Sequence, residues 1–225
     1  MRPGAGEDFL LSMLWRSPPE GAGFEKTRGA KGGGIKHPSK ALRIFVSGIR
    51  DLDSPQLLDT GQVIGANIEY FARMGCKVFV HDVNAERISE IERGRTPEKI
   101  VRGTRWSGLP YSDEQFDAVL AWDLLDYFPR EEVPSVIAEL FRVLKKEALL
   151  IALFSSERAN RVEPAQRYRI IDMDVLEHDP IAKGTNAKLF VSRLRNREIL
   201  DAFVPHRVLH FIMLKNNMRE IVVRK

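Results

Sequence analysis

The sequence predicts an α/β fold that contains a βαβ unit and ends in an antiparallel C-terminal hairpin. Two observations lead to this prediction. Residues 56–82 read as strand, glycine loop, helix and strand, which is the pattern of a βαβ unit. Apolar runs at 207–214 and 219–224 are joined by a short turn that contains two asparagines, which is typical of a β-hairpin.

Residues 1–40 differ in composition from the rest of the chain. They are rich in glycine and proline and poor in core-forming residues, so we expect them to form a flexible extension. One short apolar patch, Phe9 to Trp15, interrupts this segment. The patch could form a docking helix or a lid, or it could belong to an ill-ordered extension. Residues 41–225 are expected to form a single domain.

The composition of the 225 residues argues against several classes of protein. The single cysteine, Cys76, rules out an internal disulfide framework and a cysteine-based metal site. The net charge of +4 comes from the two ends of the chain, and no dense basic run interleaved with aromatic residues indicates a nucleic-acid partner. The longest apolar run, Ala148 to Phe154, is far shorter than the roughly 20 residues that span a bilayer. We therefore expect a cytoplasmic protein with no membrane span and no metal site.

The central unit, residues 56–82, contains the candidate binding residues. Its first strand ends at Asp59, and the loop that follows holds Gly61 and Gly65, which let the backbone approach a ligand closely. Gly75 ends the helix, and the second strand leads to Asp82. An acid at that position can accept hydrogen bonds from a ribose. Asp82 could instead cap a helix over residues 84–93, and the two roles are compatible.

The spacing of the loop residues distinguishes two nucleotide-binding families. A dinucleotide fingerprint requires three glycines at fixed offsets, which DTGQVIG lacks. The same segment resembles the first motif of the class I S-adenosylmethionine-dependent methyltransferases, with Val63 where the middle glycine usually stands. A β-branched residue is stiff, so the loop should follow a different path or hold the cofactor more loosely. The resemblance implies a Rossmann-like, three-layer sandwich with a mostly parallel, seven-stranded sheet and an antiparallel C-terminal hairpin. It also implies S-adenosyl-L-methionine as cofactor and a cofactor site that contains Asp59, Gly61, Gly65 and Asp82.

A second segment, LPYSDEQFDAVLAWDLL from Leu109 to Leu125, resembles the turn and fourth strand of the same family. In the family an acid about four residues before the leucine often contacts the adenine. Arg105 stands there instead, beside Trp106, which could stack on a purine and is a further cofactor candidate. The loop after this strand lines the methyl-transfer pocket in relatives, so Asp123 and Tyr127 are candidates for contacting the acceptor. Helix initiation and ordinary packing are their alternative roles.

The remaining segments extend the resemblance. A helix is predicted to begin at Pro134 and to end at Lys145 and Lys146, before an apolar strand from Ala148 to Phe154. This resembles the family's helix and fifth strand, although Lys146 and Glu147 replace its Pro-Gly turn. Runs at 168–175 and 188–192 predict an inserted hairpin or added strands, and a helix is expected from 197 to 203. The antiparallel terminal hairpin distinguishes a methyltransferase sheet from a wholly parallel dinucleotide-binding sheet.

These observations favour a methyltransferase that transfers a methyl group from S-adenosylmethionine to an acceptor, a small molecule or another compound, that the sequence does not identify. A non-catalytic module with the same fold, binding a nucleoside or another protein, is the alternative. Val63, Arg105 and the missing Pro-Gly turn favour the module. The co-occurrence of the loop residues with Asp82 favours nucleoside binding. A nicotinamide-dependent enzyme agrees less well with the glycine spacing.

Overall fold

The computed structural model describes residues 34–83, 85, 108–155, 166–180, 194–214 and 218–225. All of them belong to one compact unit that begins at Gly33. Several predicted features lie outside the described residues: the extension up to residue 33, the helix at 84–93, the run at 188–192, and both Arg105 and Trp106.

The main sheet of the described residues has six strands in the order β3-β2-β4-β5-β9-β8. The first four are parallel, whereas β9 pairs antiparallel with both β5 and β8. This confirms the predicted α/β fold with its antiparallel C-terminal hairpin, and the described residues supply six of the seven strands expected. The strands are β2 (Gln56–Asp59), β3 (Lys77–Val80), β4 (Phe116–Trp122), β5 (Leu144–Phe154), β8 (Arg207–Met213) and β9 (Arg219–Arg224).

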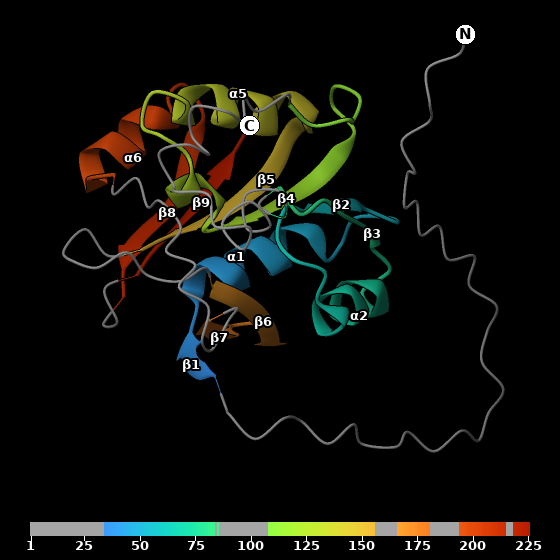
Figure 1. The fold of residues 1–225 in the computed structure, drawn as a ribbon. Coiled ribbons are helices and arrows are strands. Elements are labelled where there is room, and N and C mark those ends of the chain that lie inside the picture. Colours follow the sequence, from blue (N-terminus) through green and yellow to red (C-terminus); the bar gives the residue numbers. More distant parts are fainter. Residues whose placement is uncertain (1–33, 84, 86–107, 156–165, 181–193, 215–217) are drawn as a thin grey trace, which may run out of the picture. The chain divides into compact units, whose positions relative to one another are not determined.

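Helices cover both faces of this sheet, because each central strand buries side chains on both sides. Neighbouring residues of β2 and β4 enter two separate core clusters, as period-two alternation requires. One cluster packs against the pair α5 and α6, and the other against α1 and α2 (Figure 1). The helices are α1 (Lys40–Ile49), α2 (Gly65–Arg73), α5 (Val133–Val143) and α6 (Asn196–Ala202), with a 3-10 turn, η1 (Leu124–Tyr127), after β4.

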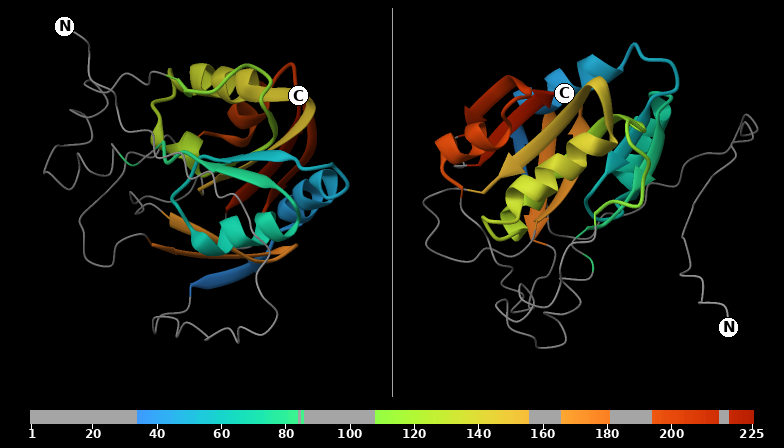
Figure 2. Two further views of the ribbon diagram at one scale, coloured as in Figure 1. Left: turned by 90° about the vertical axis from the view of Figure 1, so that its right-hand side faces the viewer. Right: turned by 90° about the horizontal axis from the view of Figure 1, so that it is seen from above.

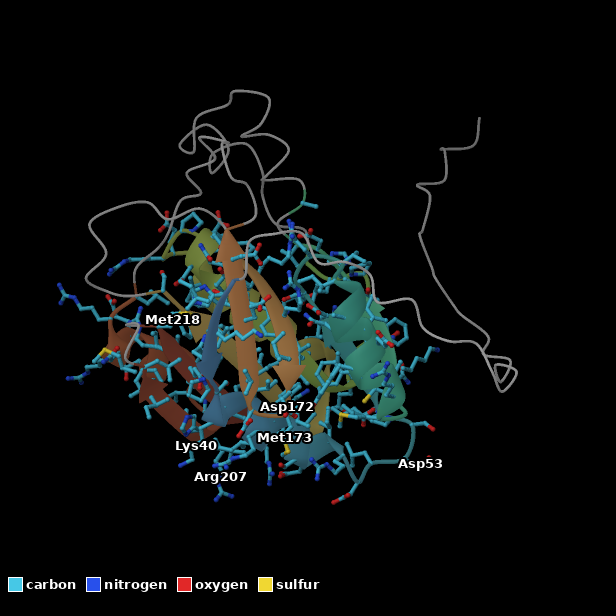
Figure 3. The ribbon with its side chains drawn as sticks, turned by 90° about the horizontal axis from the view of Figure 1, so that it is seen from below. Lys40, Asp53, Asp172, Met173, Arg207 and Met218 are labelled. Carbon is cyan, nitrogen blue, oxygen red and sulfur yellow. The ribbon has the colours of Figure 1, made fainter. Side chains whose placement is uncertain are left out.

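A second, three-stranded antiparallel sheet lies on the α1 and α2 side of the molecule (Figure 2, left). It consists of β6 (Gln166–Asp172), β7 (Val175–Pro180) and β1 (Ile35–Pro38), in the order β1-β7-β6. Figure 3 shows it from below, with Asp172 and Met173 at the turn between β6 and β7. The sequence predicts an inserted hairpin or added strands from runs at 168–175 and 188–192. The first run contains most of β6 and the turn that leads to β7, whereas the second run lies outside the described residues.

Strand β1 lies in a segment that the sequence assigned to the flexible extension. Ile35 to Pro38 pairs with β7, and Ser39 then caps α1 by accepting a hydrogen bond from the backbone N–H of Leu42 at 3.0 Å. The folded domain therefore starts before the predicted boundary at residue 40. The segment Ile-Lys-His-Pro has no alternating apolar pattern, and its proline is tolerated because β1 is an edge strand.

Helix α5 ends at Val143, three residues before the predicted end at Lys146. The sequence placed Lys145 and Lys146 in its last turn, but α5 ends at Val143 and β5 begins at Leu144. The Nζ of Lys145 lies 2.8 Å from both carboxylate oxygens of Asp117 on β4, an ion pair across the neighbouring strand. This cross-strand pair keeps Lys145 in the sheet rather than at a helix end.

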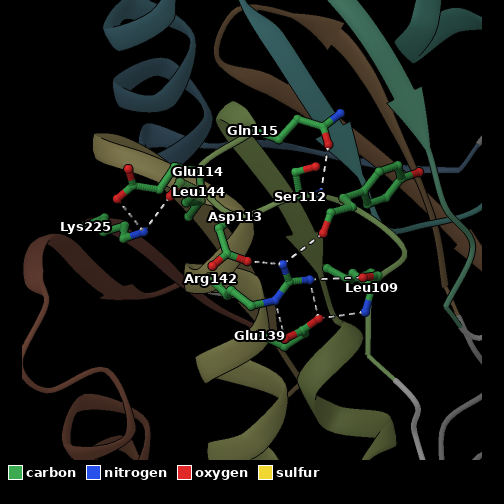
Figure 4. A network of polar contacts seen from close by, with 10 residues as sticks. Leu109, Ser112, Asp113, Glu114, Gln115, Glu139, Arg142, Leu144 and Lys225 are labelled. Carbon is green, nitrogen blue, oxygen red and sulfur yellow. Dashed lines mark hydrogen bonds and ion pairs between the residues drawn. The ribbon is translucent and has the colours of Figure 1, made fainter.

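The turn that precedes β4 is held against α5 by one arginine (Figure 4). Arg142 donates hydrogen bonds to the carboxylates of Glu139 and Asp113, and to the backbone carbonyls of Leu109 and Tyr111. Glu139 in turn accepts a hydrogen bond from the N–H of Leu109 at 2.9 Å. The planar guanidinium can satisfy four acceptors at once, which fixes the path of the chain into β4.

Candidate functional site

The candidate site lies at the carboxyl ends of β2, β3 and β4. Strand β2 has β3 on one side and β4 on the other, so the connections leave it in opposite directions. In open α/β sheets, ligands bind outside the strand ends at such a switch point. Asp59, Asp82 and Asp123 lie at or just beyond the ends of these three strands, as the sequence predicts.

Asp59 is buried and forms the centre of the loop after β2. Its Oδ1 accepts hydrogen bonds from the backbone N–H of Gly61 at 2.9 Å and from the indole Nε1 of Trp122 at 2.7 Å. Burial raises the pKa of Asp59 to about 7 against the effect of these two hydrogen bonds, and the charge of Asp82 raises it further. The carboxyl group therefore titrates near neutral pH.

Gly61 faces the indole of Trp122. A Cβ built on Gly61 would lie 2.6 Å from Cδ1 of Trp122, a distance that real Cβ atoms do not show. Trp122 is 4% exposed, and its φ of 42° is in the left-handed region, which bulky residues rarely adopt. Its ring stacks on that of Tyr168 with centroids 5.5 Å apart and an interplanar angle of 5°. The sequence analysis did not identify Trp122 or Tyr168 as site residues.

Gly65 and Asp82 lie in more open surroundings. Gly65 is the first residue of α2, and apart from its chain neighbours and its own helix backbone no atom of the described residues lies within 4 Å of a Cβ built there. Asp82 is half-buried in the segment after β3, which is held close to the loop after β2 because the N–H of Val83 donates to the carbonyl of Thr60 at 3.3 Å. Val63 is 70% exposed, so its side chain points away from the core. Its stiffness therefore has little effect on the inner face of the loop.

Asp123 and Tyr127, the candidate acceptor residues, contact each other. The hydroxyl of Tyr127 donates to Oδ2 of Asp123 at 2.5 Å, and the hydroxyl of Tyr168 donates to the same oxygen at 3.2 Å. Both candidates are buried, with 9% and 5% of their surface exposed. Burial raises the pKa of Asp123 to about 6, against the effect of the two hydroxyls. The tyrosine hydroxyls also connect β4 to β6.

Asp126 is a third buried acid at this edge of the sheet, one that the sequence analysis did not single out. Its Oδ2 accepts a hydrogen bond from the backbone N–H of Ser155 at 2.6 Å, and its Oδ1 has no hydrogen-bond partner among the described residues. Burial raises the pKa of Asp126 to about 7, although the Ser155 N–H opposes the shift. The site thus contains three carboxyl groups that are protonated more readily than ordinary aspartates.

Asn67 connects the site to the small sheet. From the first turns of α2, its Nδ2 donates to the carbonyl of Tyr168 at 2.9 Å, and its Oδ1 accepts from the N–H of Ile170 at 2.8 Å. The amide therefore acts as a strand partner for β6 and fixes its register against α2. This contact places Tyr168 over Trp122.

The described ranges contain neither a cluster of metal-binding side chains nor a membrane-spanning helix. No group of three or more His, Cys, Asp or Glu side chains in them is arranged to hold a metal ion. No helix in that part of the chain has the length and apolar character needed to cross a membrane.

Comparison with known proteins agrees with this architecture. Residues 58–152 match the model of a family described as a methyltransferase domain. No curated protein matches the chain. Among solved structures, an S-adenosylmethionine-dependent methyltransferase from Mesorhizobium loti is similar with a TM-score of 0.50 and 11% identity, covering 82% of this chain and 96% of that one. The [4+2]-cyclase SpnF has a TM-score of 0.50 and 13% identity, covering 87% of each chain.

A methyltransferase from Methanosarcina mazei is 18% identical over 77% of this chain and 93% of its own, with a TM-score of 0.48. The structural likenesses concern the fold, and one of these structures is named as a cyclase, so the fold alone does not fix the reaction. The family match covers β2, the glycine loop, β4 and most of β5. Residues 58–152 therefore match a methyltransferase domain, and the order of the strands in the main sheet agrees with the predicted fold.

Proposed function

We propose that this protein transfers a methyl group from S-adenosylmethionine to an acceptor, and that the acceptor is a small molecule. The observation that carries the proposal is the placement of Asp59, Gly61, Gly65 and Asp82 at the carboxyl ends of two adjacent parallel strands. A nucleoside cofactor requires an acid for its ribose and a loop with little side-chain bulk, and this edge of the sheet offers both.

The residues fit the nucleoside part of the cofactor. Asp82 is half-buried at the end of β3, where its carboxylate can accept hydrogen bonds from ribose hydroxyls. Among the described residues, no side chain lies within 4 Å of the Cβ position of Gly65, so these residues leave the N-terminus of α2 accessible to a ligand. A helix N-terminus also favours polar or anionic groups.

A cofactor fits less well at Gly61, because the indole of Trp122 occupies the space beside this residue. This contact specifically favours the alternative function, a non-catalytic module that binds a nucleoside or another protein. We retain the enzyme as the proposed function because the family match includes both the loop and β4.

Bound S-adenosylmethionine supplies an electrophilic methyl group on a sulfonium, so the protein has to orient the acceptor and exclude water. Asp123 is our candidate for the acceptor side. With a pKa of about 6 it is ionised at neutral pH and can take a proton from a hydroxyl or amine acceptor. Tyr127 and Tyr168 hold its carboxylate in position. The low exposure of Asp123, 9%, favours a small acceptor.

Calorimetric titration of S-adenosylmethionine and S-adenosylhomocysteine into the purified protein tests the proposal. We expect micromolar binding that Asp82→Ala weakens by about tenfold or more, the effect of losing a charge-assisted hydrogen bond. Asp201→Ala is the matched control, because Asp201 is an exposed acid on α6 that contacts only Arg197 among the ion pairs found. A folded protein that binds neither compound would instead support the interaction module.

A further inference from the structure

Trp122 lies against Gly61, between the ends of β2 and β4. If Asp82 at the end of β3 holds the ribose of a nucleoside, a group attached to that ribose would extend toward the ends of the neighbouring strands β2 and β4. These are the positions of Gly61 and Trp122. With the indole 2.6 Å from the Cβ position of Gly61, no ligand atom can lie between them.

The indole is held by partners from three different elements. Its Nε1 donates to Asp59 at the end of β2, its ring stacks on Tyr168 of β6, and its edge lies against the backbone of Gly61 in the loop that follows. Its backbone has a φ of 42°, a conformation that persists in a bulky residue only when the surroundings impose it. The position of the side chain is therefore specified by the fold rather than adopted by default.

We propose that Trp122 is the specificity-determining residue of the cofactor site: its indole excludes the aminoacyl arm of the cofactor and has to leave Gly61 before S-adenosylmethionine can bind. This inference rests on the proposed function and adds a step to it. When the indole leaves, Asp59 loses one hydrogen-bond donor, and the ammonium group of the aminoacyl arm can replace it.

The same contact connects cofactor binding to the small sheet. Tyr168 is fixed by Asn67 of α2 through its carbonyl and by Asp123 through its hydroxyl. Loss of the stacking contact removes one of the interactions that hold β6 over β4. Arrival of the aminoacyl arm is therefore expected to change the surroundings of Asp123, which is our candidate for the acceptor side.

Two ligands separate this step from nucleoside binding: adenosine, which lacks the aminoacyl arm, and S-adenosylhomocysteine, which has it. Trp122→Gly removes the indole and suits the backbone at φ 42°. We expect this variant to bind S-adenosylhomocysteine roughly tenfold more tightly than the wild type, since one hydrogen bond and one stacking contact no longer have to be broken. Adenosine affinity should stay within about twofold, because adenosine does not reach Gly61.

Trp122→Phe keeps a ring but loses the Nε1–H. Its affinity for S-adenosylhomocysteine should therefore lie between that of the wild type and that of Trp122→Gly. Phe203→Leu controls for general loosening of the core, because Phe203 is fully buried beneath α5 and contacts Phe141 rather than the site. If Trp122→Gly does not fold, Tyr168→Leu tests the same step by removing the stacking partner, with an expected gain of about three- to fivefold.

An unchanged ratio of the two affinities in the Trp122 and Tyr168 variants would overturn the inference, and the methyltransferase proposal would stand provided that S-adenosylhomocysteine binds. Failure of both ligands to bind the folded wild type and the folded variants would overturn the proposed function, and the inference with it. A crystal structure of the S-adenosylhomocysteine complex gives a direct answer: the indole should have left Gly61, and an indole still in contact with Gly61 contradicts the proposal.

Discussion

At the scale of single residues, Gly61 in the glycine loop makes room for a side chain of the protein itself, the indole of Trp122. Gly61 is required because the indole of Trp122 leaves no room for a Cβ, whereas Gly65 has open space around the corresponding position. The two glycines look alike in sequence, and the family resemblance assigns both to the cofactor. Their surroundings indicate that one is necessary for folding and the other is not.

Alanine substitution at the two positions separates these roles. Gly61→Ala should destabilise the protein by about 1–3 kcal/mol, since the new methyl group must displace the indole or the loop. Gly65→Ala should be neutral or stabilise by up to about 1 kcal/mol, because alanine is the better helix former. Chemical denaturation measures the free energy of unfolding of both variants. An equal decrease in the two would show that contact with the indole is not the reason why Gly61 is required.

The buried acids make stability depend on pH. Because the folded-state pKa of Asp126 is raised from 3.8 to about 7, the folded protein holds a proton between these values that the unfolded chain releases. The stabilisation that Asp126 gives to the folded state is fully present below about pH 4 and is lost as pH rises through 7. Asp126→Asn should therefore be more stable than the wild type at pH 8, on the order of 1–3 kcal/mol, and should lose this advantage at pH 4.

The pH series is measured by denaturation of both proteins under identical conditions. His37 shifts in the opposite direction, since burial lowers its pKa to about 4, so the wild-type curve alone mixes several groups. The difference in the free energy of unfolding between the wild type and Asp126→Asn isolates the contribution of Asp126. A difference that does not vary with pH would contradict the assignment.

Part of the site could be predicted from these residues alone, and part could not. The acid, glycine and strand-end positions follow from local spacing, so Asp59, Gly61 and Asp82 lie where the sequence predicts them. Tyr168 comes from a strand 45 positions after Asp123, and its register depends on Asn67. No periodic pattern contains that pairing. The role of Trp122 follows only from the tertiary contact with Gly61.

At the scale of elements, Arg142 fixes the turn between residues 109 and 113 against α5. Arg142→Met should leave the carbonyls of Leu109 and Tyr111 without this donor, and we expect a loss of about 1–2 kcal/mol after allowance for its partial exposure. Arg73→Met is the matched control, because Arg73 forms only an exposed i,i+4 pair with Glu69.

Hydrogen exchange adds a local readout to the Arg142 experiment. The N–H of Leu109, which donates to Glu139, should exchange faster in Arg142→Met, because Glu139 loses the guanidinium that orients it. Faster exchange throughout the domain, with no excess at Leu109, would indicate a global effect instead.

The elements themselves were predictable to different degrees. Strong apolar runs gave β2, β3, β4 and the terminal hairpin, where burial and local pattern agree. The predicted start of β5 was wrong, because Lys145 and Lys146 suit a helix end by charge. Both lysines lie in β5, where Lys145 forms an ion pair with Asp117 of the neighbouring strand. β1 could not be found, since its sequence has no pattern and its pairing partner lies far along the chain.

At the scale of the whole molecule, the start of the domain can be tested by truncation. We propose that residues 34–225 fold independently of the extension, and expect a chain that begins at Gly34 to be as stable as the full chain. A chain that begins at Ala41 lacks β1 and the Ser39 cap and should lose at least about 2 kcal/mol, half of it from the cap. Thermal denaturation compares the three proteins, and equal stability of the two truncated chains would exclude a structural role for β1.

The position of β9 in the sheet has a consequence for synthesis on the ribosome. β9 is the last strand of the chain, yet it lies between β5 and β8, and five of its six residues are buried. One edge of β5 therefore has no partner until residues 219–224 have left the ribosomal exit tunnel. Because unpaired apolar edges promote association between chains, the nascent protein is most vulnerable to aggregation until β9 has emerged and paired with β5.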